Sequence, residues 1–202
     1  MAQRGCFIVI EGIDGSGKST QATLLGKAID ALSLAEPSTG EWGKKIRQIL
    51  GGTDLPPVEE QLELFIEDRR DDAARNISPA LEGGTHIVMD RYYYSNAAYQ
   101  GALGLDPRMI LARNLEENFP KPDRVYFIDI TPEEALRRIG ARNSDGHRDL
   151  FERGPFLEKV RNIFLSFEDS SFVVIQGDAS PEEVHQRIIE DLHQNIPRLI
   201  TQ

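Results

Sequence analysis

One short glycine-rich segment limits the folds open to this chain. Residues 12–20 read Gly-Ile-Asp-Gly-Ser-Gly-Lys-Ser-Thr and match the pattern G-x-x-x-x-G-K-[ST]. They follow the apolar run Cys6–Ile10 and precede a segment that can form a helix. A strand, a glycine turn and a helix in this order predict a parallel α/β sheet whose turn surrounds an anion with backbone N–H groups.

The residue types of this segment fit a bound nucleoside triphosphate, and Mg²⁺ is expected with it. Glycines let the backbone approach the phosphates, and a helix N-terminus favours negative charge. Lys18 is expected to reach the terminal phosphates and Ser19 to bind Mg²⁺, which prefers oxygen ligands. The motif alone leaves ATPase, GTPase and kinase chemistry open. The residues predicted to bind the nucleotide are Gly12, Asp14, Gly15, Ser16, Gly17, Lys18, Ser19 and Thr20.

Short apolar runs alternate with helical patterns along the chain. The runs are unalternating and rich in Val, Ile and Phe, which is typical of strands buried on both faces; they are Cys6–Ile10, His86–Met89, Val125–Ile130 and Phe172–Ile175. Helical patterns are Pro57–Leu81, a segment that starts at Thr131-Pro132, and Glu182–Gln194 after Ser180-Pro181. We therefore predict one α/β domain over residues 1–202. Its parallel strands are expected near 6–11, 86–90, 124–130 and 172–176, with a short edge strand near 32–35.

The stretch between the glycine turn and Glu36 is short for the elements it must hold. A helix from Lys18 to Asp30 would carry the chain about 20 Å, whereas Ala31–Ala35 spans at most about 17 Å. Either the helix is shortened and the strand is only Leu32–Ala35, or residues are absent from the sequence. Because the chain must both turn and return, we expect the second, with the missing residues within Leu32–Leu34.

Composition limits the partners and the compartment. The 202 residues carry a net charge of −10 and a single cysteine. An acidic chain is not built around a basic surface for nucleic acid, and no apolar run is long enough to span a membrane. The start of the chain lacks the pattern of a secretory signal. We expect a cytoplasmic protein that binds phosphates locally, without nucleic-acid or membrane partners.

A second polar segment follows the strand predicted near 86–90. Asp90 ends that strand, and Arg91 comes next, followed by Tyr92-Tyr93-Tyr94-Ser95-Asn96. The carboxyl ends of parallel strands face the ligand crevice, so Asp90 and Arg91 are expected beside the glycine turn. A surface salt bridge for Arg91 and core packing for Tyr93 and Tyr94 remain the alternative interpretations.

These segments resemble those of the thymidylate kinase family. The resemblance is carried by FIVIEGIDGSGKSTQ at 7–21 and DRYYYSNAAYQG at 90–101, with shorter matches in order along nearly the whole chain. The glycine-rich segment alone is unspecific, whereas the second segment is specific among nucleoside monophosphate kinases. The resemblance implies a P-loop three-layer αβα fold with a five-stranded parallel sheet and a mobile lid. It also implies a homodimer that transfers the γ-phosphoryl group of ATP to dTMP, giving dTDP and ADP for dTTP synthesis.

The resemblance also implies the residues around dTMP. Phe65 would stack on thymine, Arg69 would donate a hydrogen bond to O4, and Arg91 would hold the phosphate. Helical spacing of four residues places Phe65 and Arg69 on one face, so both can line one pocket wall; core packing for Phe65 and solvation for Arg69 remain possible. The full predicted dTMP set is Asp14, Glu36, Phe65, Arg69, Arg91, Ser95, Asn96, Tyr99 and Gln100. The side chains expected at Mg²⁺ are Ser19, Asp14 and Asp90.

Phosphoryl transfer requires positive charge around the transferred group. In the implied family this charge includes an arginine from either the phosphate loop or the lid. Residues 13–16 contain no arginine, so the predicted lid at about 137–154 has to supply it. Arg142 ranks first there, although solvation is the alternative for any one lid arginine. The predicted catalytic residues are Lys18, Arg91, Arg142, Asp14, Arg148 and Arg153.

Two other functions and two departures from the family remain open. The chain could phosphorylate dUMP, dCMP or AMP, although the pair Phe65 and Arg69 favours a pyrimidine with an O4 acceptor. It could also be a nucleotide-dependent switch or regulatory ATPase, which needs no second anion site. Ala35 stands where the family usually has arginine, and Asp149-Leu150-Phe151-Glu152 where lids often read Asp-Arg-Phe-Glu. Both departures leave the arrangement of the phosphate-side arginines open.

Overall fold

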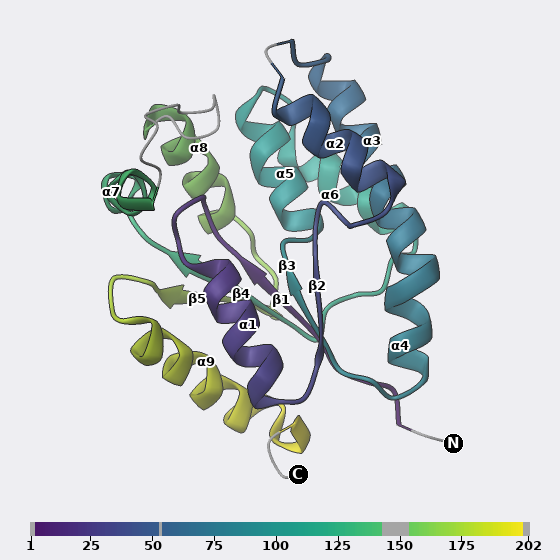
Figure 1. Ribbon diagram of the computed structural model, residues 1–202, viewed down its shortest axis with the longest axis vertical. Coiled ribbons are helices and arrows are strands. Elements are labelled where there is room, and N and C mark those ends of the chain that lie inside the picture. The colour runs from purple at the N-terminus through teal and green to yellow at the C-terminus, as the bar shows by residue number, and fades with distance from the viewer. Residues whose placement is uncertain (1–2, 53, 143–153, 200–202) are drawn as a thin grey trace.

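Five parallel strands form a single sheet in the order β2-β3-β1-β4-β5 (Figure 1). A computed structural model describes residues 3–52, 54–142 and 154–199. Every neighbouring pair of strands is parallel, so the predicted α/β fold with a five-stranded parallel sheet is confirmed. The strands are β1 Phe7–Glu11, β2 Leu32–Ala35, β3 Ile87–Asp90, β4 Arg124–Asp129 and β5 Phe172–Gln176.

Helices cover both faces of this sheet. On one face, α1 (Lys18–Ala28) and α9 (Pro181–Asn195) pack side by side (Figure 1). The helices that build the other core and its rim are α2 Glu41–Leu50, α3 Val58–Asp72, α4 Ser78–Glu82, α5 Tyr93–Ala102, α6 Pro107–Glu116, α7 Pro132–Arg142 and α8 Gly154–Leu165. Among the described residues, no helix is both long enough and apolar enough to cross a bilayer.

The central strand β1 explains why the sheet has a core on each side. Phe7 and Val9 belong to one buried cluster, whereas Ile8 and Ile10 belong to the other, and all four are fully buried. Successive side chains of a strand point to opposite faces, so an unbroken apolar run supplies both cores. The prediction that the strands are buried on both faces is wrong for the edge strand β5, where Val174 is 42% exposed. An edge strand is covered less completely than a central one.

The connection from α1 to β2 differs from the prediction. The helix ends at Ala28 instead of Asp30, and the turn places Asp30 at a φ of 49°. The residues Leu32–Ala35 then pair one by one with Ile87–Asp90. The prediction of missing residues within Leu32–Leu34 is wrong, because the helix stops earlier and the return strand crosses the sheet edge with only four residues.

The predicted helices are present with adjusted limits. The pattern over Pro57–Leu81 forms α3, a π-helical turn at Ala73–Ile77 and then α4. At the start of α9, Ser180 and Glu183 form a reciprocal capping box. This box satisfies backbone donors that the first helical turn leaves without partners.

We expect Phe164→Ala to lower the free energy of unfolding by about 3–5 kcal/mol. The Phe164 ring is fully buried and stacks on Phe127 at a centroid distance of 4.7 Å, so truncation leaves a cavity. Urea unfolding followed by circular dichroism measures the loss. The neighbouring Leu165 is 43% exposed, and Leu165→Ala is expected to cost about 1 kcal/mol or less. Equal losses in the two variants would contradict this placement of Phe164.

Candidate active site

Two cavities adjoin at the carboxyl ends of the strands. The first has a volume of about 390 Å³ and the second about 590 Å³. Asp14, Glu36 and Arg91 line both of them. These three residues follow the carboxyl ends of β1, β2 and β3, which is where ligands bind in open α/β sheets.

The second cavity surrounds the glycine-rich turn. Gly15 and Gly17 have φ values of 83° and 92°, a region in which other residues are strained. A Cβ on Gly15 would lie 2.6 Å from the carbonyl oxygen of Ala135. All predicted nucleotide-binding residues line this cavity except Gly12, where a Cβ would meet Ser16 Oγ at 2.3 Å. Gly12 therefore allows the close packing of the turn itself.

Asp14 connects the two cavities electrostatically. Its Oδ1 accepts hydrogen bonds from Lys18 Nζ at 3.2 Å and from Arg91 Nη2 at 2.5 Å. Its Oδ2 accepts one from the Tyr99 hydroxyl at 2.9 Å. Burial raises the pKa of Asp14, but the charges of Arg91 and Lys18 outweigh burial and hold the pKa well below its usual range. Asp14 is therefore a carboxylate at neutral pH.

Arg91 lies at the junction of the two cavities, beside Asp14 of the glycine-rich turn. Its Nη1 donates to Ser95 Oγ at 3.1 Å, and its guanidinium lies 4.8 Å from the centre of the Tyr99 ring. The side chain is 17% exposed. Arg91 does form an ion pair with Asp14, but this pair is inside the site rather than on the outer surface.

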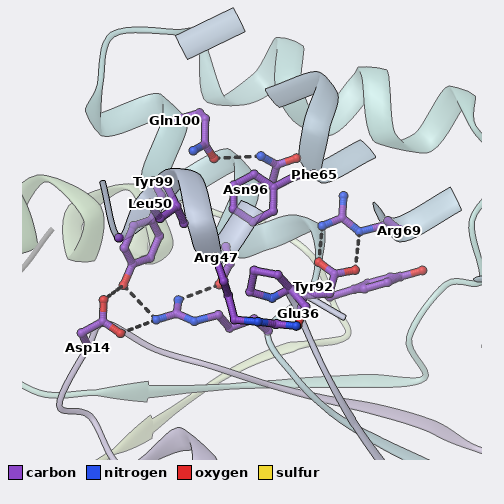
Figure 2. A pocket seen from close by; sticks show the side chains of 14 residues that line it. Asp14, Glu36, Arg47, Leu50, Phe65, Arg69, Tyr92, Asn96, Tyr99 and Gln100 are labelled. Atoms are coloured by element: carbon purple, nitrogen blue, oxygen red, sulfur yellow. Dashed lines mark hydrogen bonds and ion pairs between the residues drawn. The ribbon is translucent and has the colours of Figure 1, made fainter. Parts of the chain in front are cut away.

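The first cavity combines an aromatic ring with amide groups (Figure 2). Phe65 from α3 is half-buried at its wall, so core packing alone does not describe this ring. Asn96 Nδ2 donates to Gln100 Oε1 at 2.8 Å, whereas the buried Asn96 Oδ1 has no hydrogen-bond partner among the described residues. The wall therefore offers a stacking surface beside a free hydrogen-bond acceptor.

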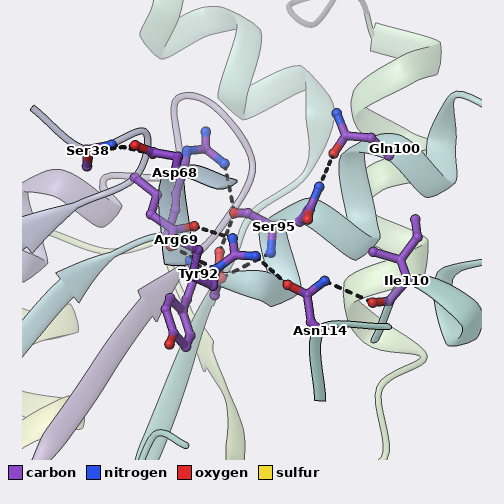
Figure 3. Close-up of polar contacts among 12 residues, drawn as sticks. Ser38, Asp68, Arg69, Tyr92, Ser95, Gln100, Ile110 and Asn114 are labelled. Atoms are coloured by element: carbon purple, nitrogen blue, oxygen red, sulfur yellow. Dashed lines mark hydrogen bonds and ion pairs between the residues drawn. The ribbon is translucent and has the colours of Figure 1, made fainter. Parts of the chain in front are cut away.

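Arg69 is fully buried at the wall of the same cavity (Figure 2). Its Nε donates to Glu36 Oε1 at 2.8 Å and its Nη2 to Glu36 Oε2. Its Nη1 donates to Asn114 Oδ1 (Figure 3). Burial raises the pKa of Glu36, and the charge of Arg69 offsets part of that rise. A guanidinium carries five N–H groups, so Nη1 and Nη2 each keep one N–H beyond these contacts.

Comparisons with known proteins agree with this geometry. The family model described as thymidylate kinase matches residues 10–188. The chain belongs to the thymidylate kinase family. It is 41% identical to a thymidylate kinase of Akkermansia muciniphila, with 98% of this chain and 96% of that protein covered. It is 43% identical to a probable thymidylate kinase of Archaeoglobus fulgidus, with 90% and 92% covered.

A solved structure shows the same fold. The thymidylate kinase of Candida albicans superposes with a TM-score of 0.82 at 25% sequence identity. The match covers 97% of this chain and 94% of that one. The similarity therefore extends over both layers of helices and is not limited to the glycine-rich turn.

In this member of the thymidylate kinase family, Asp90 and Ser19 fit a magnesium ion better than Asp14 does. Both line the second cavity, and the buried Asp90 Oδ1 has no hydrogen-bond partner among the described residues. Both oxygens of Asp14 already accept hydrogen bonds. Within the described residues no group of three or more metal-binding side chains occurs. Mg²⁺ commonly binds one or two protein oxygens together with substrate phosphates, so the residues present fit this ion.

Arg138 of α7 is the described residue of the predicted lid that reaches the second cavity. Its Nη2 donates to the carbonyl oxygen of Gly177 at 2.9 Å and its Nη1 to that of Ser16 at 3.3 Å. Arg138 was not among the predicted catalytic residues. The side chain of Arg142 and the whole of residues 143–153, with Arg148 and Arg153, lie outside the described residues.

The sequence did not indicate several residues that line the first cavity. Arg47 and Leu50 of α2 are among them (Figure 2), together with Pro37, Gly51 and Tyr92. Arg47 donates to the carbonyl oxygens of Pro37 at 2.7 Å and Ser38 at 2.5 Å. The helical spacing of Ile46 and Leu50 could have predicted an amphipathic helix, but spacing alone does not show that its neighbours border a ligand cavity.

Proposed function

We propose that the two adjoining cavities hold the two substrates of dTMP phosphorylation. As a member of the thymidylate kinase family, the chain transfers the γ-phosphoryl group of ATP to dTMP and produces dTDP and ADP. ATP would occupy the cavity around the glycine-rich turn, and dTMP the cavity lined by Phe65. The observation that carries this assignment is the presence of Asp14 and Arg91 in both walls. The two phosphates would meet at these residues.

The first cavity matches the edge of thymine. Phe65 offers a ring for stacking, and the remaining N–H groups of Arg69 can donate to O4. Asn96 Oδ1, which is buried without a partner among the described residues, can accept the hydrogen bond of N3–H. Cytosine carries an acceptor at N3 and a donor at the C4 amino group, so it would fail at both contacts.

Further residues of the first cavity would orient the sugar and phosphate of dTMP. Arg91 would hold the phosphate, with Ser95 supporting its guanidinium. Tyr99 and Gln100 line the same wall, where Tyr99 would crowd a ribose 2′-hydroxyl. Asp14 would lie near the 3′-hydroxyl. Each of these roles is the one that the family resemblance implies for the matching residue of this chain.

The second cavity would hold the triphosphate through its backbone turn and Lys18. Burial and the neighbouring charge of Arg91 lower the pKa of Lys18, whereas Asp14 opposes this shift. Ser19 and Asp90 would hold Mg²⁺, which neutralises phosphate charge when it is bound. Because phosphoryl transfer depends on positioning and charge neutralisation, Lys18, Arg91 and a lid arginine, with Arg142 ranked first, would supply the remaining positive charge.

Four broader features complete the proposal. The family supports a homodimer that works in the cytoplasm and supplies dTDP for dTTP synthesis. The acidic net charge of −10 supports small phosphorylated substrates rather than nucleic acid as partners. Light scattering of the purified protein tests the dimer: a mass near that of one chain would contradict it.

We expect dTMP to be the best acceptor in a comparison of turnover with dTMP, dUMP, dCMP and AMP. A coupled assay for ADP measures kcat/KM for each. A missing methyl group is expected to cost dUMP about 10-fold, whereas mismatched hydrogen bonds are expected to cost dCMP on the order of 10⁴-fold. Equal turnover of dCMP or AMP would indicate another monophosphate kinase. Absence of dTMP binding in calorimetry would favour a nucleotide-dependent switch.

A further inference from the structure

Glu11 is a fully buried carboxylate that the site described above does not use. It ends β1 directly before the glycine-rich turn and is 0% exposed. Its Oε1 accepts hydrogen bonds from the backbone N–H of Tyr92 at 2.9 Å and of Ser95 at 3.1 Å. Its Oε2 accepts one from the Ser95 hydroxyl at 2.5 Å. All three bonds therefore go to the segment that leads from β3 into α5.

This segment carries Arg91 in an unfavourable backbone conformation. Arg91 has a φ of 71°, a left-handed value that is uncommon for residues other than glycine. Its own N–H donates to the carbonyl oxygen of Ile10 at 3.0 Å, and the next N–H, that of Tyr92, donates to Glu11. The last two residues of β1 thus hold the backbone on both sides of the Arg91 Cα. Strained conformations of this kind persist only where surrounding contacts enforce them.

A second connection runs through side chains. The Ser95 hydroxyl donates its hydrogen to Glu11, which leaves its oxygen lone pairs free to accept. Arg91 Nη1 donates to this oxygen at 3.1 Å, and Figure 3 shows Ser95 with its hydrogen bonds as dashed lines. A carboxylate acceptor fixes the direction of the hydroxyl, and the hydroxyl in turn fixes one edge of the guanidinium.

Among the described residues, only these contacts explain why the Glu11 carboxylate is buried. Burial raises the pKa of Glu11 to about 7, against the opposing effects of the Ser95 hydrogen bond and the Arg91 charge. Burying a charge is unfavourable unless hydrogen bonds and an opposite charge compensate. A plain apolar side chain would complete the core at lower cost, but it would leave the N–H groups of Tyr92 and Ser95 without these acceptors.

We propose that Glu11 is a positioning residue for the acceptor phosphate, because its contacts with Tyr92 and Ser95 set the direction of the Arg91 guanidinium. The proposal rests on the proposed role of Arg91 in binding dTMP. It separates the substrates, because each described hydrogen bond of the Glu11 side chain leads to the β3–α5 segment. The triphosphate side instead depends on the glycine-rich turn and Lys18. Glu11 therefore acts on dTMP binding and leaves ATP binding largely unaffected.

Glu11→Gln tests this proposal. The amide keeps the size and one acceptor oxygen, but it replaces Oε2 by a donor, so the Ser95 hydroxyl loses its acceptor. We expect KM for dTMP to rise about 10-fold, as for the loss of one charge-assisted hydrogen bond, and KM for ATP to stay within about twofold. Thermal melting identifies any variant that is not folded. If Glu11→Gln does not fold, Glu11→Asp is measured instead, with the same expected rise in KM for dTMP and the same small change in KM for ATP.

Asp129→Asn is the matched control. Asp129 is also a buried carboxylate at the carboxyl end of a central strand, and it pairs with Arg161 Nε at 2.6 Å. The substitution makes the same chemical change at the neighbouring strand and is expected to leave both KM values unchanged. An unchanged KM for dTMP in the Glu11 variant would overturn the proposal, as would an equal rise for both substrates. Failure of the wild-type protein to phosphorylate dTMP would instead contradict the proposed function itself.

Discussion

Replacing Arg91 with alanine is expected to weaken dTMP binding by about 10²–10⁴-fold and to change ATP binding by no more than about threefold. Each charge-assisted hydrogen bond to the phosphate contributes about 1.5–3 kcal/mol, and a guanidinium can form two of them. We expect Lys18 and the glycine-rich turn to hold the triphosphate independently of Arg91. Calorimetry with dTMP and with a non-hydrolysable ATP analogue measures the two affinities separately.

A second arginine of comparable burial provides the control for this experiment. Arg161 pairs with Asp129, and its side chain is 27% exposed, compared with 17% for Arg91. It lies outside the described walls of both cavities. We expect Arg161→Ala to leave both affinities unchanged. Equal losses of dTMP and ATP affinity in Arg91→Ala would show that Arg91 is not specific to the acceptor side.

Replacing Arg142 with alanine is expected to lower turnover by roughly 10³–10⁵-fold, the range found for arginines that stabilise transferred phosphoryl groups. Among the described residues, the cations that line the second cavity, which is proposed to hold ATP, are Lys18, Arg91 and Arg138. Arg138 donates hydrogen bonds to the carbonyl oxygens of Ser16 and Gly177, and Arg91 is proposed to bind the phosphate of dTMP. We therefore expect a further arginine of the predicted lid, with Arg142 at the end of α7 ranked first, to supply the missing positive charge. Single-turnover kinetics at saturating substrate measures the effect on the chemical step.

The ranking of the arginines is tested in the same assay. Arg148→Ala and Arg153→Ala are expected to lower turnover less than Arg142→Ala does. A larger loss in either variant would make the ranking wrong, although the requirement for one such arginine would stand. Arg138→Ala is expected to weaken ATP binding more than it slows the chemical step, because its contacts are with backbone that borders the ATP cavity.

The fold was largely predictable because the decisive signals are local. The apolar run that contains Phe7–Ile10 is continuous, and the two faces of one central strand demand a core on each side. The glycine-rich turn fixes where the first helix begins, and Ser180 and Glu183 mark the start of the last one. Such features depend on neighbours a few residues apart, which a single sequence displays directly.

The limits of the edge strand could not be predicted in this way. The argument for missing residues assumed that the helix continues to Asp30, whereas it ends at Ala28. No glycine or proline marks that end in the sequence. The end depends instead on how β2 reaches its partner β3 at the edge of the sheet, which is a contact between segments more than 50 residues apart.

The site was predictable in its residue types but not in its internal pairings. Sequence resemblance placed Arg69 near the base, yet the contacts of Arg69 with Glu36 and Asn114 join residues from three separate segments. Glu11 received no role at all, because an acidic residue at the end of a strand does not show which donors it meets. Buried polar groups need partners, but the sequence does not identify them.

Asp14 has a further consequence for the order of events in the site. One carboxylate oxygen serves as the shared counter-ion of Lys18 and Arg91. Both cations are thereby held close together and partly stripped of water, despite their mutual repulsion. We expect incoming phosphates to take over these two cations from Asp14, so that binding exchanges one anion for another without exposing bare charge.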